Sequence, residues 1–266
     1  MNNISVLIDF TDTCYKSVEF ACEISKRASA KISLLHVSSD PGNDIKAEAE
    51  IKKYSRLLED EKINFSINVA HGNFFSSVEN AVAKIGSDLV IVGTHGKSGI
   101  RQNLLGSNIL KLVQLLKVST LVVQDLSVFP EGGFDRILFP VVPNLDFEQK
   151  TRKVSEFAKI FNSTISLYTL ADHMNSYALE VQSNLKKTKA ILDEEGIKYE
   201  HFVDESEEFS VGYARQTLKF AETKKMPVIS ILSNLANVNT YYGKVDKENI
   251  LLNKSGIPVF CANDLT

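Results

Sequence analysis

One stretch decides the fold: Ser87-Asp88-Leu89-Val90-Ile91-Val92-Gly93-Thr94-His95-Gly96-Lys97-Ser98-Gly99, continuing to Leu104-Leu105-Gly106-Ser107-Asn108. Its apolar run, Leu89–Val92, is short and followed by glycine, which is typical of an interior strand of a parallel sheet. Glycines at the strand exit allow positive φ angles and a close approach of a ligand to the backbone. A helical pattern follows from Leu104 to Leu116, and Gly106-Ser107 lies where that helix begins. Free N–H groups and the positive end of the helix dipole favour a phosphate there.

The spacing of these glycines is more specific than their presence. The pattern Gly93-x2-Gly96-x9-Gly106-Ser107, with its flanks, resembles the nucleotide-binding signature of the universal stress protein family. The resemblance implies that the two glycine segments wrap the phosphate chain of ATP, with Mg²⁺ on the phosphates. Thr94, His95 and Asn108 fall within the same motif and join its candidate nucleotide-binding residues. The sequence departs from the family pattern at Ile109, where a second hydroxyl is common.

The composition is that of a soluble globular protein, with 266 residues, 44% hydrophobic residues, 24% charged residues and a net charge of −3. This length accommodates one large domain or two of ordinary size. The sequence contains no apolar run near the ~18 residues that cross a bilayer, and its N-terminus lacks the pattern of a secretion signal. We therefore predict a cytoplasmic protein that does not associate with membranes. No basic stripe indicates binding to nucleic acid.

The cysteines and histidines do not form a metal-binding pattern. Cys14, Cys22 and Cys261 lack CxxC spacing, and none of the five histidines pairs with another histidine or a cysteine at ligand spacing. We predict buried free thiols and no structural metal. Neighbouring acids such as Glu194-Glu195 fall near expected helix ends, where solvation accounts for them.

The first half of the chain alternates between strand and helix patterns. Such alternation predicts a doubly wound parallel sheet with helices on both faces, and the family resemblance implies the strand order 3-2-1-4-5. The expected strands are Ile4–Asp9, Ile32–Val37, Ile63–Val69, Leu89–Val92 and Thr120–Val123, and the expected helices are Thr13–Ala28, Ile45–Lys62, Phe75–Ile85 and Leu104–Leu116.

The second half repeats the first after a break at Val128–Gly133, where a proline is followed by a glycine pair. We predict two similar α/β domains, at residues 1–127 and 134–266, packed together because the linker is short. The family resemblance then covers the whole chain as a tandem pair. The matching segments are Ile4–Asp9 with Ile137–Val142, Ile32–Val37 with Ile165–Leu170, Ile63–Val69 with Ile197–Val203, Leu89–Val92 with Val228–Ile231, and Asn108–Leu110 with Asn249–Leu251.

The two copies differ at the positions that would contact a nucleotide. Leucines in the loop would crowd a phosphate chain, and a glutamate at the helix start would repel an anion. We therefore predict that only the first copy binds ATP. The replaced positions are Gly93 by Leu232, Gly96 by Leu235, Gly106-Ser107 by Lys247-Glu248, and Asp9 by Val142.

Asp9 and Val37 end the first and second expected strands. In a doubly wound sheet the ligand binds where the strand order reverses. With the strand order that the resemblance implies, the crevice lies between the first and fourth strands, at Asp9 and Gly93. The resemblance implies that Asp9 lies beside the adenosine and that the Val37 backbone lines the adenine pocket. A polar strand-end residue or helix cap is the alternative interpretation of Asp9.

The loop side chains do not define a catalytic mechanism. His95 is an acid–base candidate, but a spacer role is the simpler interpretation. Lys97 and Arg101 either screen phosphate charge or are solvated cations. Ser98 and Ser107 are hydroxyls near the expected phosphates. Some members of the family that the sequence resembles phosphorylate themselves, but the sequence gives no geometry that supports this here. We predict no catalytic residue and at most slow ATP hydrolysis, consistent with a regulatory or protective role in a stress response.

Two other functions remain open from the sequence. The first is a partner-binding module without nucleotide, in which Thr120–Val123 and Val259–Cys261 pair within one chain as a pseudo-dimer, with a homodimer formed through other surfaces. The second is an apolar ligand in the degenerate half, where leucines replace glycines.

Overall fold

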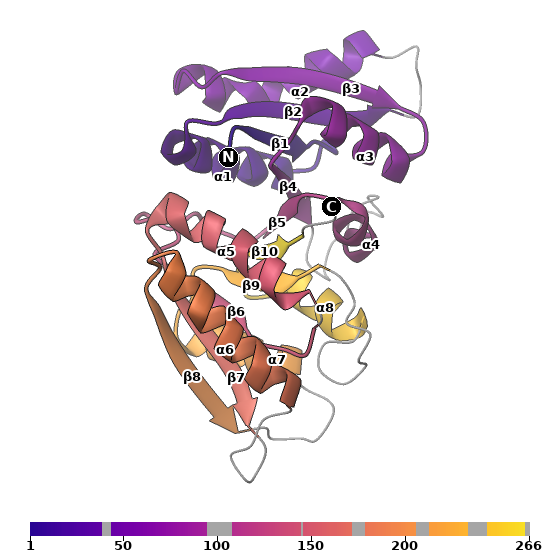
Figure 1. Ribbon diagram of the computed structural model, residues 1–266. Helices are drawn as coiled ribbons and strands as arrows, with labels where there is room; N and C mark the ends of the chain where they lie inside the picture. Colours follow the sequence, from indigo (N-terminus) through magenta and orange to yellow (C-terminus); the bar gives the residue numbers. More distant parts are fainter. Residues whose placement is uncertain are drawn as a thin grey trace.

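A single ten-stranded sheet runs through both halves of the chain, with helices on its two faces (Figure 1). The computed structural model describes residues 1–38, 44–94, 108–144, 146–171, 179–205, 213–233 and 244–263, with side chains from 247 onward in the last range. The elements of the first half are β1 Asn3–Leu7, α1 Thr13–Ala28, β2 Lys31–Ser38, α2 Asp44–Asp60, β3 Phe65–His71, α3 Phe74–Ile85, β4 Leu89–Thr94, α4 Ile109–Leu115 and β5 Ser119–Gln124. Those of the second half are β6 Arg136–Pro140, α5 Phe147–Phe161, β7 Thr164–Ala171, α6 Leu179–Glu194, β8 Tyr199–Glu205, α7 Tyr213–Thr223, β9 Ile229–Leu232, α8 Lys244–Leu251 and β10 Val259–Ala262.

The strand order is β3-β2-β1-β4-β5-β10-β9-β6-β7-β8. The predicted order 3-2-1-4-5 is confirmed for the first half, and the second half has the same order read from the opposite edge of the sheet. Strands within each half pair in parallel, for example Leu7 with Val92 between β1 and β4. The predicted α/β fold class is therefore confirmed, whereas the domain boundaries at 127 and 134 stay a prediction.

Alternating side chains on the strands create two apolar layers, one on each face of the sheet. In β1, Val6 enters the layer covered by α1, α2, α5 and α6, and its neighbour Leu7 enters the layer covered by α3, α4, α7 and α8. Successive strand residues point to opposite faces, so a fully apolar strand needs helices on both. The chain thus passes from β1 to a helix on one face and from β4 to a helix on the other.

The halves join through β5 and β10, which pair antiparallel at the centre of the sheet. The partners are Val122 with Val259, Leu121 with Phe260 and Thr120 with Cys261, so the pairing expected from the sequence is confirmed. Beside this junction the ring centroids of Phe157 and Phe260 stack 4.2 Å apart. The two halves are therefore packed together, as the short linker predicts.

Local backbone geometry repeats between the halves. In each half the first three helices, α1 to α3 and α5 to α7, are followed by a residue in the left-handed conformation, which releases the chain from the helix and satisfies its last carbonyls. These residues fall at matching places in the two copies, although their identities differ. The pairs are Ser29 with Asn162, Lys62 with Gly196, and Gly86 with Lys225.

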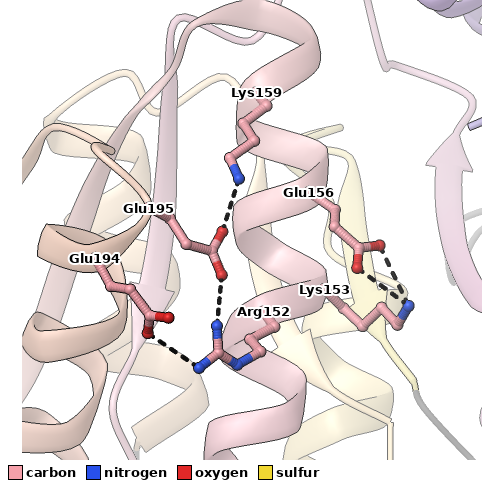
Figure 2. A network of polar contacts seen from close by, with 6 residues as sticks. All are labelled: Arg152, Lys153, Glu156, Lys159, Glu194 and Glu195. Carbon is pink, nitrogen blue, oxygen red and sulfur yellow. Dashed lines mark hydrogen bonds and ion pairs between the residues drawn. The ribbon is translucent and has the colours of Figure 1, made fainter.

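An ion-pair network joins α5 to the end of α6 on the surface of the second half (Figure 2). Arg152 contacts Glu194 at 3.1 Å and Glu195 at 3.0 Å, and Lys159 contacts Glu195 at 3.0 Å. Only 13% of the Glu195 side chain is exposed, so the interpretation of this acid as simply solvated is wrong. The reason is tertiary: α5 packs against α6, which no local pattern in the sequence shows.

Candidate functional site

The candidate site lies at the carboxyl ends of β1 and β4, where the chain leaves the sheet toward opposite faces. Leu7 pairs with Val92 in this part of the sheet, and Asp9 and Thr94 each follow two residues later. This is the switch point of a doubly wound sheet, the place where such folds bind ligands. Asp9 and Thr94 therefore lie at the edge of the sheet where the crevice is predicted.

The Asp9 carboxylate organises the turn between β1 and α1. Its Oδ1 accepts hydrogen bonds from the Thr11 amide at 3.1 Å, the Thr11 hydroxyl at 2.6 Å and the Cys14 thiol at 3.1 Å. Burial, followed by the charge of Asp9, raises the pKa of the Cys14 thiol to about 12 and keeps it protonated as a donor. Within the described parts of the chain, Oδ2 has no hydrogen bond. Asp9 thus has the structural role of the alternative interpretation and retains one oxygen for a ligand.

Phe10, which the sequence reasoning missed, sets the backbone direction at this turn. Its φ angle is +63°, a conformation that bulky side chains rarely adopt. Its ring lies 4.4 Å from the His36 ring, and His36 Nδ1 is 2.8 Å from the Ile8 carbonyl oxygen. The matching residue of the second half is Pro143, whose ring holds φ near −65°. The second half cannot form the same turn.

Gly93 lies inside β4 under the first turns of α1. A Cβ atom at this position would lie 2.9 Å from Ser17 Oγ and 2.9 Å from Thr13 Cγ2. The missing side chain therefore lets α1 pack directly on β4, a role that the glycine pattern did not reveal. It adds to the expected role in ligand approach.

Replacing Gly93 with alanine is expected to lower the free energy of unfolding by about 1–3 kcal/mol, because the methyl group overpacks the contact between α1 and β4. The matched control is Gly132→Ala, since a Cβ at Gly132 meets nothing within 4 Å and alanine there reduces only the entropy of the unfolded chain. Urea unfolding of both variants measures the difference. Equal stabilities for the two variants would contradict this packing role.

Thr94 carries the least satisfied polar group of the crevice. It is 1% exposed, and its hydroxyl has no hydrogen-bond partner among the residues that the structure describes. A buried hydroxyl without a partner costs about 1–3 kcal/mol, so such a group indicates a ligand or water that completes it. The polar groups present therefore fit a ligand with hydrogen-bonding oxygens.

Two of the remaining predicted residues, Val37 and Asn108, belong to the described part of the chain, and the others do not. Val37 is partly buried at the end of β2 and pairs with Ala70. Asn108 caps α4 with its carbonyl oxygen, which accepts from the Leu112 amide at 2.9 Å. His95, Gly96, Gly106 and Ser107, together with Lys97, Ser98 and Arg101, lie outside the described residues.

The second half differs at the matching edge of the sheet. Val142 and Leu232, which replace Asp9 and Gly93, are buried. Lys247, at the position matching Gly106, is buried as well, and its Nζ donates to the Leu232 carbonyl at 2.8 Å. A buried lysine therefore stands at the position that corresponds in sequence to Gly106.

The described residues contain no group of three or more histidine, cysteine or acidic side chains arranged to hold a metal ion. Cys14, Cys22 and Cys261 are free and buried, as predicted. Within the same residues, no helix combines the length and apolar character needed to span a membrane.

Comparison with known proteins is consistent with this description. Residues 1–124 match the model of the universal stress protein family. The chain is 27% identical over 146 residues to the universal stress protein YxiE of Bacillus subtilis strain 168, covering 46% of this chain and 99% of that protein.

Two solved structures resemble the chain over nearly its full length. One is a universal stress protein from Archaeoglobus fulgidus, with a TM-score of 0.74 and 18% identity over 98% of both chains. The other is a functionally unknown protein from Pseudomonas aeruginosa PAO1, with a TM-score of 0.65 and 14% identity, covering 99% of this chain and 93% of that one. These likenesses show the fold, and the two α/β units fit a tandem form.

Proposed function

We propose that this chain, which over residues 1–124 belongs to the universal stress protein family, binds ATP in its first half as a regulatory or structural ligand. The single observation that best supports the proposal is the buried Thr94 hydroxyl at the switch point, which has no hydrogen-bond partner in the described part of the chain and lies within the glycine pattern. A polar group in this state requires an acceptor or donor from outside the described chain. A nucleotide phosphate is such a group.

Each residue of the site has a role in this proposal. Asp9 offers Oδ2 to the adenosine, and the Val37 backbone borders the adenine. The backbone around Gly93 and Gly96, with Gly106, Ser107 and Asn108 at the start of α4, wraps the phosphates. Mg²⁺ would neutralise part of the phosphate charge when bound.

The proposal assigns the nucleotide a binding role and assigns no residue to its hydrolysis. General-base catalysis needs a side chain within hydrogen-bond reach of the attacking water. Among the predicted nucleotide-binding residues that the structure describes, Asp9 is the one carboxylate, and its Oδ1 already accepts three hydrogen bonds. We therefore expect hydrolysis to be slow. Rapid turnover by pure protein, abolished by one side-chain change near the phosphates, would overturn this part.

Denaturing the purified protein and identifying the released small molecules by mass spectrometry tests the function directly. We expect an adenine nucleotide, with ATP as the leading candidate over ADP and AMP. Release of no small molecule, even after incubation with ATP and Mg²⁺, would overturn the proposal.

A partner-binding pseudo-dimer without nucleotide is the second candidate, and the pairing of β5 with β10 favours it. This pairing completes within one chain an interface of the kind that universal stress proteins commonly form between two chains. A homodimer would then use other surfaces. An empty protein in the release experiment favours this function, and a retained lipid-like molecule favours an apolar ligand in the second half.

A further inference from the structure

Two lysines are buried at the switch point of the second half. Lys150 is 1% exposed and Lys247 is 4% exposed. Lys150 lies in the first turn of α5, and Lys247 lies in the first turn of α8. These helices cover opposite faces of the sheet, so the lysines approach the ends of β6 and β9 from both sides. Fully buried lysines are rare unless they are paired.

Lys150 is the matching residue of Ser17, with the same separation in sequence as Ser29 and Asn162. Ser17 lies against Gly93 in β4, and α5 packs against β9 in the same manner. The Lys150 Nζ atom is buried and has no hydrogen-bond partner within the described ranges of the chain. Burial lowers the pKa of Lys150, and the exposed Asp146 opposes that shift.

Lys247 is near enough to Lys150 for their charges to interact. Burial is the main cause that lowers the pKa of Lys247 to about 8, the charge of Lys150 lowers it further, and Cys261 on β10 opposes the change. Its Nζ donates to the Leu232 carbonyl. A buried ammonium group without a partner, such as that of Lys150, is strongly unfavourable, and the positive charge of the neighbouring Lys247 adds to the cost.

We propose that Lys150 and Lys247 form an anion site in the second half that binds a phosphate group, either as free phosphate or as part of a phosphate ester. Each ammonium group carries three N–H donors, and a tetrahedral phosphate offers several charged oxygens to both. The adjacent Val142 and Leu232 side chains are buried and exclude water, which strengthens the attraction. Side-chain charge would hold the anion here, because the two ammonium groups outnumber the one carboxylate of Glu248 that is expected to repel an anion at this helix start. In the first half the glycine backbone is expected to hold the phosphates instead.

The test is a titration of the full chain with inorganic phosphate at pH 7, at constant ionic strength maintained with sodium chloride. Tm of the natural protein is expected to rise with phosphate, because a ligand that binds only the folded state stabilises it. Lys150→Met should reduce phosphate affinity by about tenfold to a hundredfold, as expected for the loss of a charge-assisted contact. It should also raise Tm without phosphate, because a buried unpaired charge is removed.

Lys153→Met provides the matched control. Lys153 lies on the same helix with its side chain partly exposed and paired with Glu156 at 3.2 Å, so the variant makes the same change in net charge away from the site. This variant should keep the phosphate response. Loss of the response in both variants, or in neither, would overturn the proposal.

The pH dependence separates an anion site from a pair of neutral amines. The folded-state pKa of Lys247 lies below its ordinary value, so the destabilisation is full below about pH 8 and disappears as the pH rises toward 10.5. Without phosphate, the free energy of unfolding of the natural protein, relative to that of Lys247→Met, should increase as the pH rises from about 8 to 10.5. With saturating phosphate the gain should shrink. A gain that is unchanged by phosphate would indicate neutral amines and contradict the site.

Equilibrium dialysis shows whether the site binds free phosphate or a phosphate ester, and which half of the chain binds it. Inorganic phosphate is compared with glycerol phosphate in natural protein and in Gly106→Glu, which blocks the proposed nucleotide site of the first half. One phosphate per chain that persists in Gly106→Glu supports the second-half site whether or not ATP binds. Binding that disappears in Gly106→Glu would assign the anion to the first half and overturn the proposal.

Discussion

Replacing Gly106 with glutamate is expected to reduce ATP affinity by about a hundredfold or more. The change places a negative charge and a longer side chain immediately before α4, where the phosphates are proposed to bind. Like charges in a partly buried site repel by several kcal/mol, and each 1.4 kcal/mol corresponds to a tenfold change in affinity. Isothermal titration calorimetry with ATP and Mg²⁺ measures the loss, and circular dichroism verifies the fold.

The second half supplies the control for this substitution. Glu248 directly follows Lys247, in the pair that matches Gly106-Ser107, so Glu248→Ala removes a comparable charge from the other copy. We expect this variant to bind ATP as tightly as the natural protein does. If Gly106→Glu and Glu248→Ala change ATP affinity by the same factor, the nucleotide is not confined to the first half.

Replacing Phe134 with alanine is expected to lower the free energy of unfolding by about 3–5 kcal/mol, the usual range for a buried phenylalanine. Phe134 is 0% exposed and follows the linker between the halves. Its ring centroid lies 5.2 Å from Phe129 in the linker, 6.2 Å from Phe20 in α1 and 5.0 Å from Phe161 in α5. The cavity would therefore open at the junction, where it loosens both halves. Urea unfolding monitored by circular dichroism measures the loss.

Val128→Ala is the matched control in the same linker. Val128 is 72% exposed, and substitutions at such positions usually change stability by no more than about 0.5 kcal/mol. A cost below about 1 kcal/mol for Phe134→Ala would contradict a junction held by this aromatic cluster.

The sequence predicted the fold well because periodicity and repetition both reflect burial. α1 begins and ends at the predicted residues, and the central pairing of β5 with β10 is as expected. The first strand ends at Leu7 instead of Asp9, although the Ile8 amide still donates to the Leu35 carbonyl at 2.9 Å. The cause is the left-handed turn at Phe10, which no apolar pattern encodes. For the helix expected from Leu104, the described part is Ile109–Leu115.

The candidate site was predictable only in outline. Strand ends located Asp9 and Val37, because parallel strands end at a common edge. Their surroundings were not predictable: the bonds of Asp9 to Thr11 and Cys14, and the contact of α1 with Gly93, depend on how elements pack.

The lysines of the second half show the same limit. The comparison of copies identified Lys247 only as a replacement for glycine. Lys150 lies among charged residues in a helical pattern typical of a solvated face. Its alignment with Ser17 was the one available signal, and it becomes informative only when the position of α1 on β4 is known.

The central claim is an asymmetry between two similar halves, of which only the first holds a nucleotide. Equilibrium dialysis of the full chain against ATP and Mg²⁺ tests this most directly, because it counts the bound nucleotides per chain. The account predicts one ATP per chain at saturation. Two per chain, or none, would contradict it.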